Sequence, residues 1–271
     1  MHEIILFAIS IGAGFLGALL GIGGGMIIVP VLTLFLHVDI RYAIAASLIS
    51  IVATSSGAAA SFLRDHMTNL RVAVLLEVGT VSGAITGFLI ASFVQPRVLF
   101  LIFGVFLLFS ALMMLRKRGE SLARTNHPWS EKLKLASSFP NERGERVAYM
   151  VEKVPLGLLY MYVAGVLSAL LGIGSGILKV LAMDGAMKLP MKVSSATSNF
   201  MIGVTATASA GAYFVQGSIR PEIAAPVSVG IIVGSYGGAR AMVKMKPQMI
   251  RIIFVVLLAV VSIQMIMKGL S

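Results

Sequence analysis

The polar residues of the chain divide it into long apolar stretches that carry almost no charge. These stretches cover residues 4–36, 42–63, 72–94, 98–115, 155–187, 193–215, 223–239 and 252–267. A helix that crosses the hydrocarbon core of a bilayer needs roughly 17–25 predominantly apolar residues. Six of the eight stretches therefore predict one transmembrane helix each.

The stretches 4–36 and 155–187 are too long for one straight span, and a glycine cluster interrupts each near its middle. The clusters are Gly21-Ile22-Gly23-Gly24-Gly25 and Gly172-Ile173-Gly174-Ser175-Gly176. The 11 residues that follow each cluster would form a helical arm about 16 Å long. Such an arm crosses only half of a roughly 30 Å hydrocarbon core. We therefore predict two re-entrant hairpins whose glycine turns meet near the middle of the membrane.

Composition agrees with a membrane protein. Hydrophobic residues make up 58% of the chain and charged residues 12%, whereas soluble proteins carry about 25% charged residues. The absence of cysteine excludes disulfides and thiolate metal sites. A net charge of +11 would suggest nucleic-acid binding in a soluble protein. Here Lys and Arg lie mainly between apolar stretches, so we expect no nucleic-acid partner and interpret the charge as orienting the chain in the cytoplasmic (inner) membrane.

A polar stretch at 116–154 separates a first transmembrane repeat (1–115) from a second (155–271). It holds nine Lys or Arg and five Glu, and we interpret it as a cytoplasmic connector, with a small regulatory domain as the less favoured alternative. The spacing of its last apolar residues is typical of an amphipathic helix on the membrane surface. These residues are Val147, Met150, Val151 and Val154. At the N-terminus, Met1-His2-Glu3 lacks the basic region of a cleaved signal peptide.

The two halves repeat with an offset of 151 residues. Gly14–Gly25 matches Gly165–Gly176 at nine of twelve positions. In the same ungapped register Ser47 aligns with Ser198, Thr54 with Thr205 and Pro96 with Pro247. Duplicated halves are typical of transporters, and inverted halves place the substrate site near the bilayer midplane.

The distribution of Lys and Arg distinguishes parallel from inverted halves. With four full spans per half, the halves are parallel, and 13 basic residues are cytoplasmic against 8 outside, Lys179 being intramembrane. With re-entrant hairpins the halves are inverted, and the numbers become 17 and 4. Because cytoplasmic loops are enriched in Lys and Arg, we predict an all-α membrane protein of two inverted repeats. Each repeat is a glycine-broken re-entrant hairpin plus three transmembrane helices, and both termini lie outside.

The glycine turns are candidates for an anion site. The first N–H groups of the short helix after each turn lack backbone acceptors and lie at the positive end of the helix dipole. Glycines allow an anion to approach such groups closely. Tight helix packing is the alternative explanation of the glycines, but two turns in equivalent positions favour a site. The predicted backbone donors are Gly23, Gly24, Gly25, Gly174, Ser175 and Gly176.

Two charged residues lie inside apolar stretches. Lys179 follows the second glycine turn, and an embedded charge is by default a functional-site hypothesis. We expect it to face the substrate, with snorkelling or pairing with Asp184 as alternatives. Glu77 is a candidate for carrying a coupling proton; pairing with Arg71 or a simple interfacial position are its alternatives.

Hydroxyl and amide side chains near the starts of the helices after the hairpins add candidate hydrogen-bond donors. We select Ser47, Ser198 and Asn199 for substrate binding, although such groups in membrane helices often bond their own backbone. The four histidines are scattered and no phosphate-binding motif is present. We therefore expect no metal and no cofactor.

The sequence resembles the sulfite exporter TauE/SafE-type transporters over nearly the whole chain outside the connector. The resemblance rests on residues 21–30, their degenerate copy at 172–180, and residues 189–200. It implies movement of a small sulfur-containing anion, sulfite or an organosulfonate, across the cytoplasmic membrane without ATP. The family pattern has a third glycine and a later proline in both copies, whereas the second copy here has Ser175 and Leu181 at these two positions. That difference suggests a one-sided site.

We therefore predict a secondary transporter that works by alternating access, and not an enzyme. An anion channel of the same architecture is the alternative, and an intramembrane enzyme is disfavoured because no nucleophile–base cluster is visible. The expected partners are a small anionic substrate and the lipid bilayer. Association into a homo-oligomer stays open.

Overall fold

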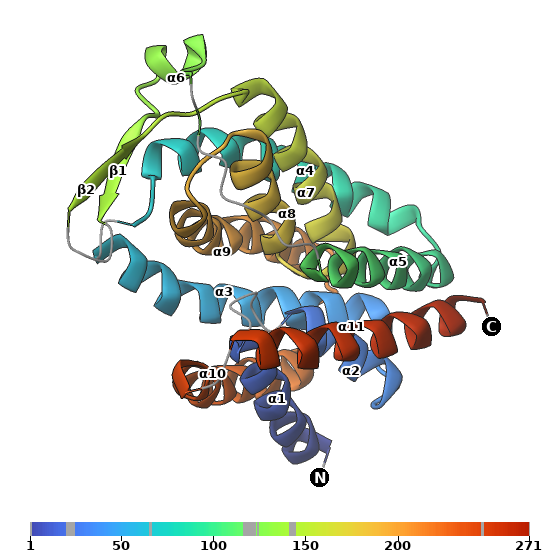
Figure 1. Cartoon of the computed structure of the whole chain (residues 1–271). Coiled ribbons are helices and arrows are strands. Elements are labelled where there is room, and N and C mark those ends of the chain that lie inside the picture. Colours follow the sequence, from blue (N-terminus) through green and yellow to red (C-terminus); the bar gives the residue numbers. More distant parts are fainter. Residues whose placement is uncertain are drawn as a thin grey trace.

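The computed structural model describes residues 2–19, 25–64, 67–115, 123, 125–140, 145–244 and 247–270. Long helices pack side by side and form the body of the molecule (Figure 1). The first half consists of α1 (His2–Leu19), α2 (Gly25–Leu34), α3 (Ile40–Arg64), α4 (Leu70–Phe93) and α5 (Pro96–Leu115). The second half consists of α7 (Val154–Leu171), α8 (Gly176–Val180), the π-helix η1 (Leu181–Ala186), α9 (Met191–Val215), α10 (Pro221–Lys244) and α11 (Pro247–Leu270).

The predicted apolar stretches correspond closely to these helices. Each of the six stretches assigned to a single span is one helix, and α3, α4 and α5 begin 151 residues before α9, α10 and α11. By length and composition, Leu70–Phe93, Pro96–Met113 and Val154–Leu171 are suited to cross a membrane within the described residues. The predicted all-α membrane architecture is confirmed at this level.

The two overlong stretches are each broken into a long and a short helix, as predicted. In the first half α2 has 10 residues. In the second half α8 and η1 follow one another over 5 and 6 residues. Each short helix packs back against the long helix before it, α2 against α1 and α8 with η1 against α7. The glycine-broken stretches are therefore helical hairpins.

The two halves interleave, because the largest helix contacts join one helix from each half. Helix α1 packs against α10, α4 against α7, α5 against α11, and α3 against α9. The second pair repeats the first with the halves exchanged. The remaining two pairs each join equivalent helices.

Contacts at glycines show how closely the packing of one half on the other is repeated when the halves are exchanged. A Cβ added to Gly14 would meet the backbone of Ile231, and a Cβ added to Gly165 would meet the backbone of Thr80. Gly165 lies 151 residues after Gly14, and Thr80 lies 151 residues before Ile231. The second contact is therefore the first one with the two halves exchanged. Gly83 against Tyr162 and Gly234 against Ile11 form a second such pair of contacts. Reciprocal contacts of this kind are the signature of a two-fold interface.

The equivalent helices α5 and α11 run in opposite directions. Gly104 lies against Ser262 and Ile266, whereas Gly269 lies against Leu101 and the backbone of Arg97. From Ser262 to Gly269 along α11, the facing residues on α5 run backwards, from Gly104 to Arg97. These contacts show that α5 and α11 pack antiparallel.

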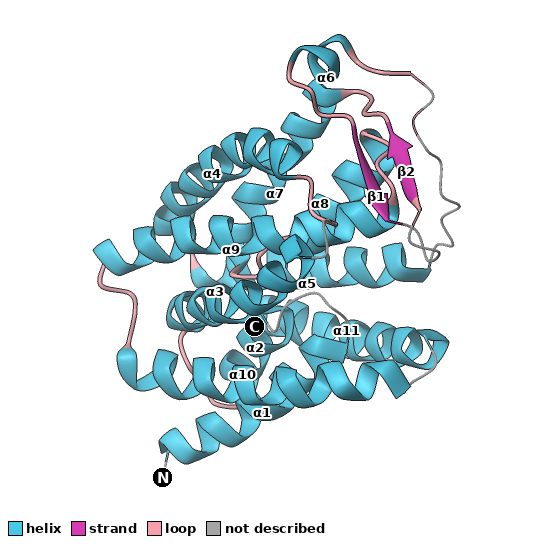
Figure 2. Ribbon diagram, turned by 90° about the vertical axis from the view of Figure 1, so that its left-hand side faces the viewer, coloured by secondary structure: helices cyan, strands magenta, loops and turns pink. Residues whose placement is uncertain are grey.

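The connector contains a short helix, α6 (Pro128–Lys132), and a β-hairpin of β1 (Ser137–Pro140) and β2 (Arg146–Tyr149). The strands are antiparallel, with Phe139 opposite Val147, and they occupy one corner of an otherwise helical molecule (Figure 2). The predicted amphipathic helix at the end of the connector is therefore wrong. Four apolar positions are too few to distinguish a helix from a strand. In addition, Lys153 adopts a left-handed conformation (φ 43°) that separates Met150 and Val151 from the helix beginning at Val154.

The connector is fixed to the start of α4 by Asn69. Its side chain accepts from the N–H of Val72 and donates to the Leu135 carbonyl and to the Tyr149 hydroxyl, both at 2.8 Å. Arg71 donates to the Lys134 carbonyl at 2.9 Å. These contacts hold the connector against the membrane helices.

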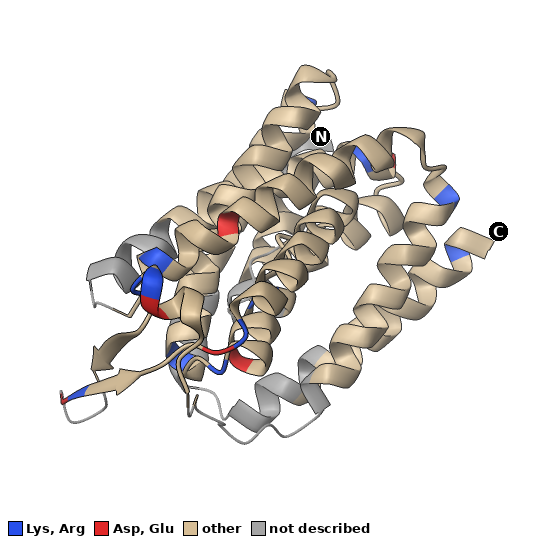
Figure 3. Cartoon of the chain, turned by 90° about the horizontal axis from the view of Figure 1, so that it is seen from above, with Lys and Arg blue, Asp and Glu red and all other residues tan. Residues whose placement is uncertain are grey.

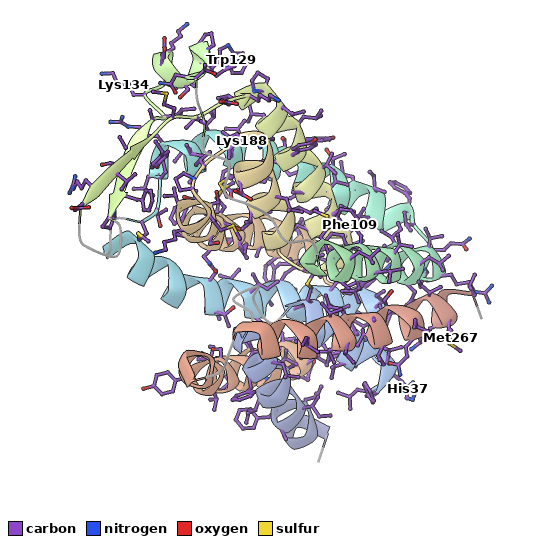
Figure 4. The ribbon with its side chains drawn as sticks, in the orientation of Figure 1. His37, Phe109, Trp129, Lys134, Lys188 and Met267 are labelled. Atoms are coloured by element: carbon purple, nitrogen blue, oxygen red, sulfur yellow. The ribbon has the colours of Figure 1, made fainter. Side chains whose placement is uncertain are left out.

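Most charged residues lie toward the two ends of the helix bundle or on the connector (Figure 3), whereas Glu77 and Lys179 are buried between the helices. Trp129 and Lys134 lie on the connector, far from His37 and Met267 at the other end of the bundle (Figure 4). At that opposite end, Arg220 donates to the Tyr42 hydroxyl, and Lys268 donates to the carbonyl oxygen of Thr33. Both chain termini lie away from the connector (Figure 1).

Candidate functional site

The second glycine turn is a buried loop with an unusual backbone. Gly172 and Gly174 have φ of 65°, and Ser175 has φ of 50°, a region that glycine adopts freely and other residues avoid. Gly172 caps the end of α7, and Gly176 begins α8. Of the predicted donors in the first turn, Gly23 and Gly24 lie outside the described residues. Gly25 is the first residue of α2.

The two hairpins meet at their glycines. A Cβ added to Gly25 would lie 2.8 Å from the carbonyl oxygen of Gly172 and 2.8 Å from Ser47 Oγ. Ser47 donates to the same Gly172 oxygen at 2.6 Å. Only a glycine at position 25 allows this approach. The predicted meeting of the two hairpins is thus present between the described ends of the turns.

The selected polar side chains have different surroundings. Ser47 and its counterpart Ser198 both lie at the second glycine turn, since Ser198 donates to the Gly176 carbonyl at 3.2 Å. Asn199 donates to the carbonyl of Ser195 on its own helix and is only partly buried. The structure therefore brings the two serines together at the turn, whereas the amide of Asn199 serves its own helix.

Ser175 combines two unfavourable features. Its hydroxyl is 2% exposed and has no hydrogen-bond partner among the described residues. A buried hydroxyl without a partner and a non-glycine residue in the left-handed region each cost free energy. Strain that the surrounding structure retains is often found at ligand sites. Ser175 is thus the group in the turn that most needs a ligand oxygen.

We expect Ser175→Gly to raise the free energy of unfolding by about 1–2 kcal/mol, because glycine removes the left-handed penalty. The same change should weaken binding of a small sulfonate, because it removes the unpartnered hydroxyl. Ser175→Ala is the matched variant, since it keeps the strained conformation and removes only the oxygen. Thermal denaturation with and without methanesulfonate measures both effects. An equal methanesulfonate-induced shift in Tm for all three proteins would show that the hydroxyl is not a ligand.

Lys179 lies one helical turn after Ser175 and is fully buried. Its ammonium group donates to the carbonyl oxygen of Met201 at 3.0 Å and to the Thr205 hydroxyl, and it lies 3.4 Å from Glu77 Oε1. An ammonium group has three N–H donors, and these three contacts use all of them. Lys179 and Glu77 thus form an ion pair with each other, which none of the predicted alternatives included. Lys179 does not snorkel, and Arg71 donates to the connector rather than to Glu77.

Glu77 is held by hydroxyl groups as well as by the lysine. Thr80 donates to its Oε2 at 2.7 Å, and Thr205 Oγ1 lies 3.2 and 3.1 Å from its two carboxylate oxygens. The pair links α4 to α8 and α9. Sequence spacing did not predict it, because Glu77 and Lys179 are 102 positions apart. The available signal was chemical: an embedded charge usually pairs with another.

The site that the repeat relates to this pair is uncharged. Shifted by 151 residues, Lys179 corresponds to Ile28 and Glu77 to Ser228. Ile28 is fully buried, and Ser228 Oγ lies 3.2 Å from Ser50 Oγ. Both charges of the pair, one from each half, are therefore replaced together.

Comparison with known proteins agrees with the membrane architecture. The model of the family described as "Sulfite exporter TauE/SafE" matches residues 6–265. The chain is 26% identical to the probable membrane transporter protein YunE of Bacillus subtilis over 278 residues, covering 100% of this chain and 99% of that protein. It is also 26% identical to a probable membrane transporter protein of Methanocaldococcus jannaschii, covering 97% of this chain and 95% of that protein.

A third relative, the probable membrane transporter protein YdhB of Bacillus subtilis, is 24% identical and covers 88% of this chain and 87% of its own length. No solved structure matches the chain. All three relatives bear the name of transporters and not of enzymes. The family match extends over both repeats and the connector. The chain therefore belongs to the sulfite exporter TauE/SafE family.

Proposed function

We propose that the protein is a secondary transporter that moves a small sulfur-containing anion, of the sulfite or organosulfonate class, across the cytoplasmic membrane by alternating access. The observation that carries the proposal is the reciprocal packing of two similar halves around touching glycine hairpins. Such an arrangement has two nearly equivalent conformations, related by exchanging the roles of the halves. Rocking between them exposes a site near the middle to each side in turn.

Two features support inverted halves. The equivalent helices α5 and α11 run antiparallel, as inversion requires. The connector, with nine of the Lys and Arg residues, lies far from the two termini (Figure 1). With the connector in the cytoplasm, both termini are outside.

The proposed anion site is the second glycine turn. Ser175 supplies a hydroxyl between two glycines, Gly174 and Gly176, against which the Ile202 side chain packs. Ser47 and Ser198 are adjacent donors that now bond carbonyls of the same turn. Lys179 supplies the positive charge after one of its present contacts is released. Small oxyanions have several acceptor oxygens that match such a group of donors.

A binding screen tests the proposal. Purified protein is heated with sulfite, methanesulfonate, sulfate or acetate, and the shift in Tm is measured. An anion at about 100 times its Kd raises the free energy of unfolding by about 2.7 kcal/mol. We expect sulfite or methanesulfonate to stabilise the protein, and Lys179→Ala to abolish the effect. Stabilisation by acetate alone would contradict the sulfur-anion class.

Flux measurements separate a transporter from an anion channel. Liposomes that contain the protein are loaded with unlabelled anion, and the uptake of labelled anion is followed. Alternating access predicts faster uptake when unlabelled anion is present inside, because the loaded site returns more readily. Uptake that is independent of internal anion and proportional to concentration without saturation would instead indicate a channel.

A further inference from the structure

The buried pair of Lys179 and Glu77 is the feature that the proposed anion site leaves unexplained. It occurs at only one of the two sites that the repeat relates, since Ile28 and Ser228 occupy the equivalent positions. Buried ion pairs are often no more stabilising than apolar side chains of similar size. The related site has an isoleucine and a serine in place of the lysine and the glutamate. Stability alone therefore gives no reason for the two charges.

An anion can reach the Lys179 ammonium only if one of its contacts is given up. All three N–H donors are in use. The contact to Glu77, at 3.4 Å, is the longest of the three, whereas the Met201 carbonyl lies at 3.0 Å. Ser175 directly precedes α8, and its carbonyl oxygen accepts from the backbone N–H of Lys179 at 3.1 Å, so both residues belong to the start of this short helix. An anion between Ser175 and Lys179 would therefore compete with the Glu77 carboxylate.

Charge balance decides what must accompany the anion. The empty pair is neutral, with one positive and one negative charge. A monovalent anion added to it would leave a net negative charge in a low-dielectric site, which is strongly unfavourable. A proton on Glu77 restores neutrality, with Lys179 positive, the anion negative and the carboxylic acid uncharged.

The hydroxyl groups around Glu77 suit both protonation states. Thr80 donates to the carboxylate, but the carbonyls of Leu76 and Glu77 lie 3.4 and 3.3 Å from its oxygen. Thr205 likewise has the Met201 carbonyl at 3.0 Å. Because a hydroxyl both donates and accepts, each threonine can turn its hydrogen to its own helix. Either can then accept a hydrogen bond from the protonated carboxyl.

We propose that Glu77 is the proton-binding site that couples anion transport to proton movement, one proton for each monovalent anion. The proton comes from water on the side to which the site is open and is released with the anion on the other side. This inference rests on the proposed transport function and names its coupling ion. The counterpart of Glu77 in the repeat, Ser228, has no carboxyl group, so the proposed coupling uses the single proton of Glu77.

Other titratable groups lie on the helices that pack around the pair. Arg71 and Lys192 lie in the first turns of α4 and α9, and Asp184 lies on η1. Tyr213 donates to the Ala169 carbonyl, and Tyr162 donates to Thr86; Tyr160 is exposed. Lys179 is the only titratable side chain that contacts Glu77 in the described part of the chain. Glu77 is thus the carboxyl whose protonation frees the lysine.

The wild-type protein tests the coupling directly. Methanesulfonate is the probe, because a sulfonate stays ionised across the pH range of the assay whereas sulfite itself titrates. Protein in liposomes with an internal pH dye is given an inward methanesulfonate gradient at zero membrane potential. We expect the interior to acidify as the anion enters, with flux that does not respond to an imposed potential. Binding should strengthen by up to about tenfold for each unit by which pH falls, because one proton is linked to one anion.

Variants distinguish coupling from a structural pair. Glu77→Gln mimics the protonated carboxyl, so anion binding should become independent of pH and entry should no longer acidify the interior. The double change Glu77→Ser with Lys179→Ile copies the related uncharged site of Ile28 and Ser228, so it should fold and lose methanesulfonate binding at every pH. Ser228→Ala alters the equivalent uncharged position and should keep the wild-type pH dependence.

The outcomes separate this inference from the proposed function. Saturable methanesulfonate entry without acidification, or a Glu77→Gln protein with the wild-type pH slope, would overturn proton coupling and leave anion transport intact. If sulfite is bound and methanesulfonate is not, the same comparison is made at constant bisulfite concentration. Failure of sulfite and methanesulfonate alike to bind or enter at any pH would refute the proposed function and this inference with it.

Discussion

Replacement of Lys179 alone by isoleucine is expected to lower the free energy of unfolding by about 3–5 kcal/mol, because it leaves a buried carboxylate without its opposite charge. Glu77 is 8% exposed, and its Lys179 contact is the only ion pair described for it. The remaining hydroxyl partners, Thr80 and Thr205, donate hydrogen bonds but bring no charge. The loss is measured by equilibrium unfolding in mixed detergent micelles at neutral pH.

The second change, Glu77→Ser, should recover most of this loss. The double variant has the residues of the related uncharged site, where Ile28 is packed in the core and Ser228 Oγ lies near Ser50 Oγ. A double-mutant cycle gives the coupling between the two positions. We expect the double variant to be closer in stability to the wild type than either single variant. Additive losses would show that the two side chains act independently and that the pair is not coupled.

Gly14→Ala is expected to destabilise the protein by about 1–3 kcal/mol or more, because the added methyl group cannot be accommodated by a side-chain rotation. A Cβ at this position would lie 2.5 Å from the carbonyl oxygen of Ile231 and 2.7 Å from its Cα. Both are backbone atoms, so α1 and α10 would have to separate. This helix pair has the most extensive contact in the described structure, and the effect should extend along its length.

Gly12→Ala is the matched control on the same helix. A Cβ at Gly12 meets nothing within 4 Å, so the change should stabilise α1 by up to about 1 kcal/mol through helix propensity. Gly165→Ala, the equivalent change in the other half, should destabilise the protein as Gly14→Ala does. Thermal unfolding of the purified variants gives the order of their stabilities. A Gly14→Ala protein as stable as Gly12→Ala would contradict the close helix approach.

The course of the membrane helices could be predicted from the sequence because lipid imposes one requirement on every span. Apolar length and the need to satisfy backbone hydrogen bonds within a segment leave a helix as the solution. The starts of α3 and α9, at Ile40 and Met191, follow the 151-residue repeat. The breaks after α1 and α7 follow from glycine clusters and from arms too short to cross a bilayer.

The connector was predicted less well because no such single requirement acts on it. Val147 and Val151 fit a helical spacing, yet they lie in and after a strand. Val147 faces Phe139 across the hairpin, and Tyr149 is held by Asn69 from α4. These contacts come from residues distant in sequence, so local periodicity could not reveal them.

The sequence by itself determined the membrane class, the repeat, the broken hairpins and the presence of two embedded charges. Each of these follows from local composition or from comparing the chain with itself. Only the tertiary structure decided that Glu77 pairs with Lys179, that Ser175 is buried without a partner, and that Gly25 touches Gly172. Those contacts depend on how helices from opposite halves cross. A crossing brings together backbone atoms and side chains whose sequence separation carries no information about their distance.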